Sequence, residues 1–382
     1  MTTGASMSRI KKLLFLAIGL IVSLLFAVLV LELSLGGWIF HDPWNATKPL
    51  NIVRSRTIHY SVESIYGPGA PAVVYTRDRN GLRGQCEDPR NIDILTVGGS
   101  TTDQRYISDG QTFQDQLAAQ VRQRLNKELR VCNAGVDGHS TFGHLAAFQN
   151  WFPLIDGLRP KYVLLYIGIN DAGFRLQPMA ERDPEQVSGL SGSIAKAIRE
   201  KSALYGLDQT VSALFKHGSE NRYARHGAAL PREQDYVATT TSAGIDALIA
   251  ANVAGYSSRL QAILGYIGNF GARPICVTQP SRIWIGQGGA LRGLPDMFRY
   301  EGVMYNGLDY RASLLALNQA MSRVCTEAGG VFIDIGARDF APQDFYDPVH
   351  MTPSGANRLA GYLLEELNDR QLLGGLRDVS AP

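Results

Sequence analysis

The chain has 382 residues, of which 45% are hydrophobic and 19% charged, and its formal net charge is +2. This composition is typical of a globular protein with a sizeable core, and it excludes an intrinsically disordered chain. Since acidic and basic residues nearly balance, the sequence offers no electrostatic footprint for a nucleic acid, and we expect no nucleic acid partner.

The first element in the chain is an uncharged apolar stretch, Leu13–Leu31, which is just long enough to cross a bilayer as a helix. Basic residues precede it at Arg9, Lys11 and Lys12. The positive-inside rule therefore predicts a cytoplasmic tail at 1–12, a transmembrane anchor and a body outside the cytoplasm. A cleaved signal peptide is the alternative, but the residues that follow the stretch offer only a poor cleavage site.

The rest of the chain divides by composition and pattern. Residues 32–90 contain Pro, Gly and Arg with little periodicity, and we expect a stalk and lead-in. Residues 91–370 alternate short apolar runs with helical patterns, which predicts one α/β domain with a parallel sheet covered on both faces. Within it, residues 172–242 are polar and too long for a single connection, so we expect an insertion or a lid over the site. Residues 371–382 are expected to be a tail.

Five apolar runs in this domain are predicted to be strands. They are Ile92–Val97, Arg130–Asn133, Tyr162–Ile167, Pro274–Thr278 and Val331–Ile335. Four stretches with helical spacing accompany them: one capped by Thr112, one running from Ile245 until Gly271 ends it, one over Tyr310–Ala328, and a last one that opens with Thr352 before a proline. In parallel sheets ligands bind beyond the carboxyl ends of the strands, so residues that follow those ends are the candidates for a site.

A serine follows the first predicted strand. The run ends in Gly98-Gly99-Ser100, which predicts a tight turn that presents a hydroxyl at the strand end. Asp347 and His350 lie three apart on a late loop. A neutral imidazole can take the proton of a serine, and a carboxylate orients that imidazole, so we predict a Ser100, His350, Asp347 triad. A phosphate-binding loop is the alternative for the glycine turn, but no lysine follows as such a loop requires.

Two further strand ends carry candidate donors for a developing oxyanion. Gly138 follows the second strand, where glycine lets a backbone N–H approach a substrate closely. Asn170 follows the third strand and can donate from its amide. Taken singly, Gly138 is better explained by an ordinary turn, and Asn170 fits an ordinary turn as well as a donor.

The histidines outside the Asp347 motif show no metal-binding spacing. His139, His144, His217 and His226 are interpreted as ordinary surface or loop residues, and we expect neither a metal nor a cofactor.

The four cysteines contain no CxxC pair. Cys132 and Cys276 fall in predicted strands, which favours small buried thiols. A disulfide in an extracytoplasmic protein is the alternative, and the sequence does not assign a pairing for Cys86 or Cys325.

The segments around Ser100, Gly138, Asn170 and Asp347–His350, in this order, resemble the sequence blocks of the SGNH, or GDSL-like, hydrolase superfamily. The resemblance implies a flavodoxin-like three-layer α/β/α fold with a five-stranded parallel sheet. It also implies an oxyanion hole made by the backbone N–H groups of Ser100 and Gly138 and the side chain of Asn170.

The resemblance covers residues 91–171 and 331–365, with one departure. Gly99 stands where the Gly-Asp-Ser version of the motif has aspartate. Since that carboxylate is not one of the catalytic groups, we expect the change to mark a subgroup and to leave the chemistry intact.

The sequence thus predicts a serine esterase, anchored in a bacterial inner membrane with its N-terminus in the cytoplasm and its catalytic domain in the periplasm. The expected substrate is an ester, with an O-acetylated envelope polysaccharide ahead of a lipid. Three alternatives stay open: an O-acyltransferase using the same site, a lipase or thioesterase, and a binding subunit without activity. Trp284, Tyr300 and Tyr305 fit either an acceptor groove or the core.

Overall fold

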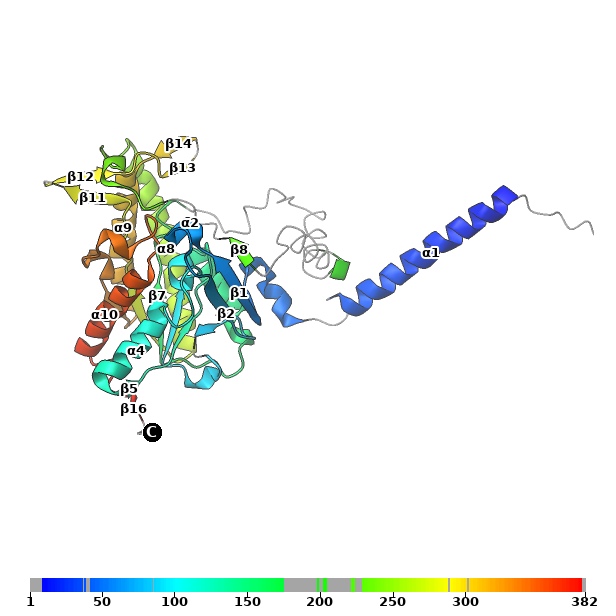
Figure 1. The fold of residues 1–382 in the computed structure, drawn as a ribbon, viewed down its shortest axis with the longest axis horizontal. Coiled ribbons are helices and arrows are strands. Elements are labelled where there is room, and N and C mark those ends of the chain that lie inside the picture. Colours follow the sequence, from blue (N-terminus) through cyan, green and yellow to red (C-terminus); the bar gives the residue numbers. More distant parts are fainter. Residues whose placement is uncertain are drawn as a thin grey trace, which may run out of the picture. The chain divides into compact units, whose positions relative to one another are not determined.

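The computed structural model describes residues 9–36, 38, 42–84, 86–174, 198, 202–204, 221–223, 229–287, 289–300 and 302–379. The chain divides into two compact units: one contains α1 (Arg9–Leu35), and the other is the body, which begins at Pro49 (Figure 1). Among the described helices, α1 is the one whose length and composition suit a membrane-spanning helix or a signal sequence.

The body is built on a six-stranded sheet in the order β15-β10-β7-β4-β6-β3. Its strands are β3 (Arg83–Gly84), β4 (Ile94–Gly98), β6 (Val131–Asn133), β7 (Tyr162–Tyr166), β10 (Arg273–Val277) and β15 (Val331–Ile333). Five strands are parallel, and the short β3 pairs antiparallel with β6 at the edge. In chain order the parallel strands lie 2-1-3-4-5, the flavodoxin-like arrangement. All five predicted strands are confirmed.

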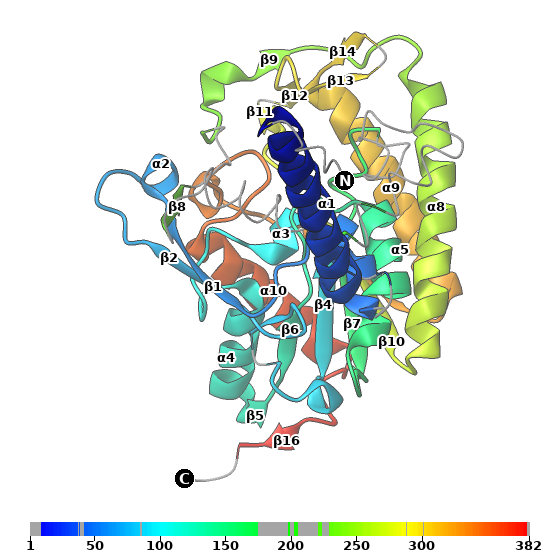
Figure 2. The same ribbon diagram turned by 90° about the vertical axis from the view of Figure 1, so that its right-hand side faces the viewer.

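Helices cover both faces of this sheet (Figure 2). α4 (Phe113–Leu125) and α10 (Pro353–Asp369) pack together on one face, whereas the other face carries α5 (Thr141–Asn150), α8 (Ile245–Asn269) and α9 (Gly307–Glu327). The central strands are mostly apolar because both faces are covered, and every residue of β4 is buried. The three-layer α/β/α architecture is confirmed.

Capping residues that can be recognised in the sequence set the ends of several helices. The hydroxyl oxygen of Thr112 accepts a hydrogen bond from the backbone N–H of Asp115 at 3.3 Å, and Thr352 caps α10 in the same way through Gly355. Gly271 has φ +71°, the left-handed conformation that favours glycine just after a helix. α9 begins at Gly307 because Asn306 caps it, slightly earlier than expected.

The globular body begins well before residue 91, where the sequence analysis placed its start. β1 (Arg56–Ser61) pairs antiparallel with β2 (Val73–Arg77) and parallel with β8 (Asn221–Tyr223). Side chains of β1, β2 and the residue after β1 form a small apolar core together with Tyr106, which follows α3 in the chain. The core consists of Ile58, Tyr60, Val62, Val73, Tyr75 and Tyr106. These strands escaped the sequence analysis because they lack the continuous apolar runs of the central strands; β1, for example, contains Arg56, Thr57, His59 and Ser61.

The remaining elements are short. The other strands are β5 (Lys127–Glu128), β9 (Val237–Ala238), β11 (Trp284–Gln287), β12 (Ala290–Gly293), β13 (Phe298–Tyr300), β14 (Val303–Tyr305) and β16 (Arg377–Asp378). Besides α2 (Glu63–Tyr66) and α3 (Ser100–Asp103), there are 3-10 turns at η1 (Pro43–Leu50), η2 (Pro89–Asn91), η3 (Phe152–Leu154), η5 (Glu233–Asp235), η6 (Ile335–Ala337) and η7 (Pro342–Asp344).

The C-terminal segment, expected to be a tail, packs on the body as far as it is described. β16 pairs antiparallel with β5, and Leu372, Leu373 and Leu376 belong to the main core cluster. Most of the expected insertion at 172–242 lies outside the described residues. Of the aromatic residues that fitted either a groove or the core, Tyr305 is buried in a core cluster with Phe174 and Ile245, so it belongs to the core.

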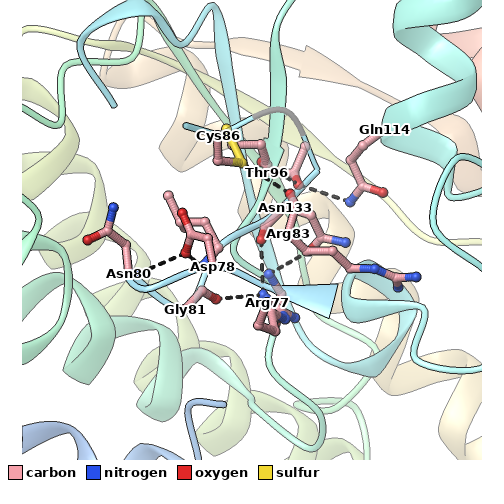
Figure 3. The surroundings of a disulfide bond; sticks show 12 residues. Arg77, Asp78, Asn80, Gly81, Arg83, Cys86, Thr96, Gln114 and Asn133 are labelled. Carbon is pink, nitrogen blue, oxygen red and sulfur yellow. Dashed lines mark hydrogen bonds between the residues drawn. A yellow bond between two sulfur atoms is a disulfide. The ribbon is translucent and has the colours of Figure 1, made fainter. Parts of the chain in front are cut away.

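All four cysteines are joined in disulfides. Cys86 bonds Cys132, which ties the loop after β3 to β6, and Cys276 of β10 bonds Cys325 of α9. Figure 3 shows the first of these bonds at the edge of the sheet. The interpretation of Cys132 and Cys276 as free buried thiols is therefore wrong, because each side chain faces a second cysteine from a distant part of the chain.

Candidate active site

Ser100 lies at the start of α3, directly after the turn that ends β4. The two glycines before it are required by close contacts. A Cβ on Gly98 would lie 2.4 Å from the carbonyl oxygen of Tyr166, and a Cβ on Gly99 would lie 2.5 Å from Nδ2 of Asn170. Both distances are shorter than real Cβ contacts, so the turn brings Ser100 against the end of β7 only because neither residue has a side chain.

The structure brings Ser100, His350 and Asp347 together in one hydrogen-bonded chain. Nε2 of His350 lies 2.8 Å from Oγ of Ser100, and Nδ1 of His350 lies 2.6 Å from Oδ2 of Asp347. A carboxylate can only accept, so the proton of a neutral imidazole belongs on Nδ1, and Nε2 accepts from the serine hydroxyl. This is the geometry that activates a serine as a nucleophile.

The loop that carries Asp347 holds its carboxylate in place. The backbone N–H groups of Val349 and His350 donate to Oδ1 at 2.8 Å and 2.7 Å. Burial works to raise the pKa of Asp347, but the hydrogen bond and charge of His350 and the two backbone N–H groups outweigh it and lower the pKa below its ordinary value. The carboxylate is therefore ionised at neutral pH. The ring of Tyr346 stacks on the imidazole, with an interplanar angle of 7°.

The predicted oxyanion donors lie on the loops after β6 and β7. Nδ2 of Asn170 donates to the carbonyl oxygen of His139 at 2.8 Å and lies beside Gly99, the neighbour of Ser100. An amide nitrogen carries two N–H groups, so it can serve a second acceptor. Gly138 has φ +79°, which explains the need for glycine there. Both loops and Ser100 follow the carboxyl ends of parallel strands, the edge at which ligands bind in such sheets.

The sequence analysis missed a set of buried charged groups behind Ser100. Asp103, the last residue of α3, accepts hydrogen bonds from Arg77 and from the hydroxyl of Tyr75, both on β2. Arg105 lies 3.3 Å from the same carboxylate and also pairs with Asp137, which precedes Gly138, at 3.0 Å. In Figure 3, Arg77 also reaches the carbonyl oxygens of Gly81 and Asn133. Arg77 lies in the segment interpreted as a lead-in, so its role was not visible from the sequence.

Asp171, the neighbour of Asn170, supports the site without facing it. Its fully buried carboxylate accepts from the backbone N–H and the hydroxyl of Thr141 at the start of α5, and Arg259 of α8 lies 3.6 Å away. It thereby ties the loop after β7 to two helices.

Two histidines near the site differ from the expectation of surface or loop residues. His139 and His144 are buried, and burial lowers the pKa of His139 to about 4. Burial also lowers the pKa of His144. Nε2 of His139 lies 3.0 Å from the carbonyl oxygen of Leu50, so it carries the proton of the neutral ring. Loop position did not reveal this because the residue that His139 contacts, Leu50, lies before the start of the predicted domain. His217 and His226 lie outside the described residues.

The residues that the structure describes contain no cluster of three or more His, Cys, Asp or Glu side chains arranged to hold a metal ion.

Comparison with known proteins also points to an ester hydrolase. The sequence profile of the GDSL-like lipase/acylhydrolase family matches residues 96–358. No curated protein matches the chain. Similar solved structures include an α/β hydrolase from the metagenome of Lake Arreo, Spain, at 16% identity, which covers 73% of this chain and 95% of that chain with a TM-score of 0.40.

Two further solved structures have the same TM-score of 0.40. A lipase/acylhydrolase from Enterococcus faecalis is 15% identical and covers 76% of this chain and 100% of its own. A catalytic mutant of an acetylxylan esterase from Geobacillus stearothermophilus is 14% identical and covers 76% of this chain and 98% of its own.

The profile match spans more than half of the 382 residues and includes Ser100, Asn170, Asp347 and His350, which confirms the resemblance on which the sequence analysis relied. The chain therefore belongs to the GDSL-like lipase/acylhydrolase family and is a hydrolase of ester bonds.

Proposed function

We propose that the protein is a serine esterase that works through an acyl-enzyme on Ser100. The observation that carries the proposal is the continuous hydrogen-bonded chain from Oγ of Ser100 through the imidazole of His350 to the carboxylate of Asp347, with distances of 2.8 Å and 2.6 Å. A serine hydroxyl is a weak nucleophile at neutral pH, and this arrangement supplies the base and the group that orients it.

In the first half of the reaction, Nε2 of His350 takes the proton of Ser100 as Oγ bonds to the carbonyl carbon of the ester. Negative charge then develops on the carbonyl oxygen, and we assign its stabilisation to the backbone N–H groups of Ser100 and Gly138 and the amide of Asn170. The tetrahedral intermediate collapses, and the alcohol leaves with the proton that His350 returns. The ionised Asp347 stabilises the imidazolium during these steps.

In the second half, a water molecule gives a proton to His350 and attacks the acyl-enzyme. The free acid leaves, and Ser100 regains its proton from His350. If a sugar hydroxyl replaced water in this step, the same groups would transfer the acyl group, and the product would be an acylated acceptor.

For location, we propose a single-pass anchor in a bacterial inner membrane, with the body in the periplasm. The basic residues Arg9, Lys11 and Lys12 precede the apolar part of α1, which supports a cytoplasmic N-terminus. Two disulfides support an oxidising compartment for the body. Because such a location adjoins the cell envelope, we propose O-acetyl groups of an envelope polysaccharide as the substrate, ahead of lipid esters.

The test is hydrolysis of p-nitrophenyl esters with acyl chains from two to twelve carbons by the full-length protein in detergent. Ser100→Ala is the loss variant. Ser322→Ala is its matched control, because Ser322 lies beside Gly330 and Val331 at the start of β15, the sheet edge opposite to Ser100. We expect turnover of short chains that Ser100→Ala abolishes and Ser322→Ala retains. Unchanged turnover in Ser100→Ala would refute the acyl-enzyme, and a preference for long chains would move the substrate to lipids.

A further inference from the structure

A buried glutamine joins two loops of the site. Gln279 follows β10 and is 2% exposed. Its side-chain Oε1 accepts a hydrogen bond from the backbone N–H of Ile169 at 2.9 Å, and its Nε2 donates to Oγ1 of Thr101 at 2.6 Å. Both partners are themselves buried, so each bond replaces water that the groups have lost.

The two partners are the neighbours of residues already assigned to the reaction. Thr101 follows Ser100 in α3, and Ile169 precedes Asn170 in the loop after β7. The side chain of Gln279 therefore spans from the segment of the nucleophile to the segment of the amide donor.

The sheet alone does not set the relative position of these segments. β4 and β7 are paired along their length, and Gly98 with Tyr166 is the last pair of the ladder. Ser100 and Asn170 lie beyond that pair, where backbone pairing of the two strands has ended. A side-chain bridge beyond the last pair can fix the relative position of the two loops, which backbone pairing no longer sets.

The peptide of Ile169 is held from its other side as well. The hydroxyl of Tyr310, on α9, donates to the carbonyl oxygen of Ile169. With Gln279 accepting from the N–H, both polar groups of this residue are bound. The backbone directly before Asn170 thus has a defined position, and the bridge transmits that position to Thr101.

We propose that Gln279 is a positioning residue that holds the Ser100 hydroxyl and the Asn170 amide at the separation that the tetrahedral intermediate requires. This inference rests on the proposed function of Ser100 and Asn170. Gln279 does not touch the reacting atoms, so its effect is on the placement of the donors. Loss of an oxyanion donor costs about 10² to 10³ in kcat, and a misplacement of about 1 Å costs about 10².

The experiment compares p-nitrophenyl acetate kinetics of the full-length protein with four variants. Gln279→Leu removes both bonds at nearly constant volume. Gln279→Glu keeps an acceptor for Ile169, and the Thr101 hydroxyl can turn round and donate to the second oxygen. Thr101→Val, alone and combined with Gln279→Leu, tests whether the two side chains act as one unit. Thermal unfolding is recorded for every variant.

The matched control is Gln120→Leu. Gln120 of α4 is also a buried glutamine, and its Nε2 donates to the backbone and side-chain oxygens of Asn357 on α10, on the face that those helices cover. It shares the chemistry of Gln279, but its amide bonds to Asn357 instead of Thr101 and Ile169. A merely structural role would lower the melting temperature in both Leu variants and leave kcat alone.

We expect Gln279→Leu to lower kcat by about 10- to 100-fold with KM nearly unchanged, and Gln279→Glu to recover much of that loss. The double variant should be no slower than Gln279→Leu. The inference is overturned if Gln279→Leu keeps the kcat of Gln120→Leu, or if the two effects multiply in the double variant. Absence of turnover in the unaltered protein, or full turnover in Ser100→Ala, would instead overturn the proposed function on which it rests.

Discussion

Arg77 of β2 forms a buried ion pair with Asp103, the last residue of the short helix that Ser100 begins. The arginine lies outside the matched family region, which starts at residue 96, yet its guanidinium lies behind the candidate nucleophile. The same guanidinium donates to the carbonyl oxygen of Gly135, near the loop of Gly138. The segment before residue 91 is therefore a structural part of the site.

Replacing Arg77 by Met should destabilise the body. Asp103 would stay buried, with Arg105 as its remaining cationic partner, and breaking a buried pair in this way costs about 3–5 kcal/mol. Urea denaturation of the full-length protein in detergent measures the loss. Arg79→Met, at an exposed position two residues later, should change the free energy of unfolding by no more than about 0.5 kcal/mol. Equal effects in the two variants would contradict a special role for the pair.

Gly99→Asp restores the aspartate of the Gly-Asp-Ser motif and should nevertheless impair this protein. A Cβ at this position would lie 2.5 Å from Nδ2 of Asn170 and 2.8 Å from the carbonyl oxygen of His139, so the amide donor must move. We expect kcat to fall by about 10²-fold, as for other displaced catalytic groups. Gly265→Ala, in open space on α8, is the control and should retain activity. An active Gly99→Asp would show that the Asn170 loop adapts.

Asp347→Asn should lower kcat/KM by about 10³- to 10⁴-fold, as the equivalent change does in other serine triads. The amide has nearly the size of the carboxylate but does not stabilise the imidazolium or select the tautomer with the proton on Nδ1. The measurement is steady-state hydrolysis of p-nitrophenyl acetate. Asp344→Asn is the control, because Asp344 is a buried carboxylate three residues away that pairs with Arg358. It should cost stability and spare the rate. If both variants stay active, Asp347 does not orient His350.

His139 should make the protein less stable in acid. Burial lowers its pKa from 6.5 to about 4, so between these pH values the unfolded chain binds a proton that the folded state does not. Stability is then complete above about pH 6.5 and decreases as the pH falls towards 4, by roughly 3 kcal/mol. Urea denaturation from pH 4 to 7.5 measures this slope. His139→Gln, which can still donate to Leu50, should reduce the slope and leave the part that buried His144 contributes. An equal slope in the variant would assign the acid sensitivity to other groups.

The two disulfides predict that the protein, purified from an oxidising compartment, has no thiol that reacts when it is denatured without reductant. Reduction, or the pair of changes Cys86→Ser and Cys132→Ser, should cost about 2–5 kcal/mol, because the bond closes a long loop. Thiol titration in denaturant, with and without reductant, is the measurement. Four reactive thiols in the unreduced protein would refute both bonds and remove one support for a periplasmic body.

The sequence by itself determined the elements whose signals are local. The five apolar runs form the five parallel strands, because burial on both faces requires a continuous apolar stretch of a few residues. Thr112 and Thr352 cap α4 and α10, because capping needs a particular residue type directly before a helix. The order of the short motifs was also enough to select Ser100, Asn170 and His350 as candidates, since each follows a strand or precedes a helix at a recognisable spacing.

Only the tertiary structure decided which distant residues complete the site. Gln279 contacts Thr101 across 178 residues of sequence, and Arg77 contacts Asp103 from a segment without clear periodicity. Likewise, His139 is buried by chain that precedes the predicted domain. A single hydrogen bond or ion pair between remote segments imposes no period and no spacing on the sequence. Its partners meet because the hydrophobic core and the parallel sheet bring their backbones together, and that packing exists only in the folded chain.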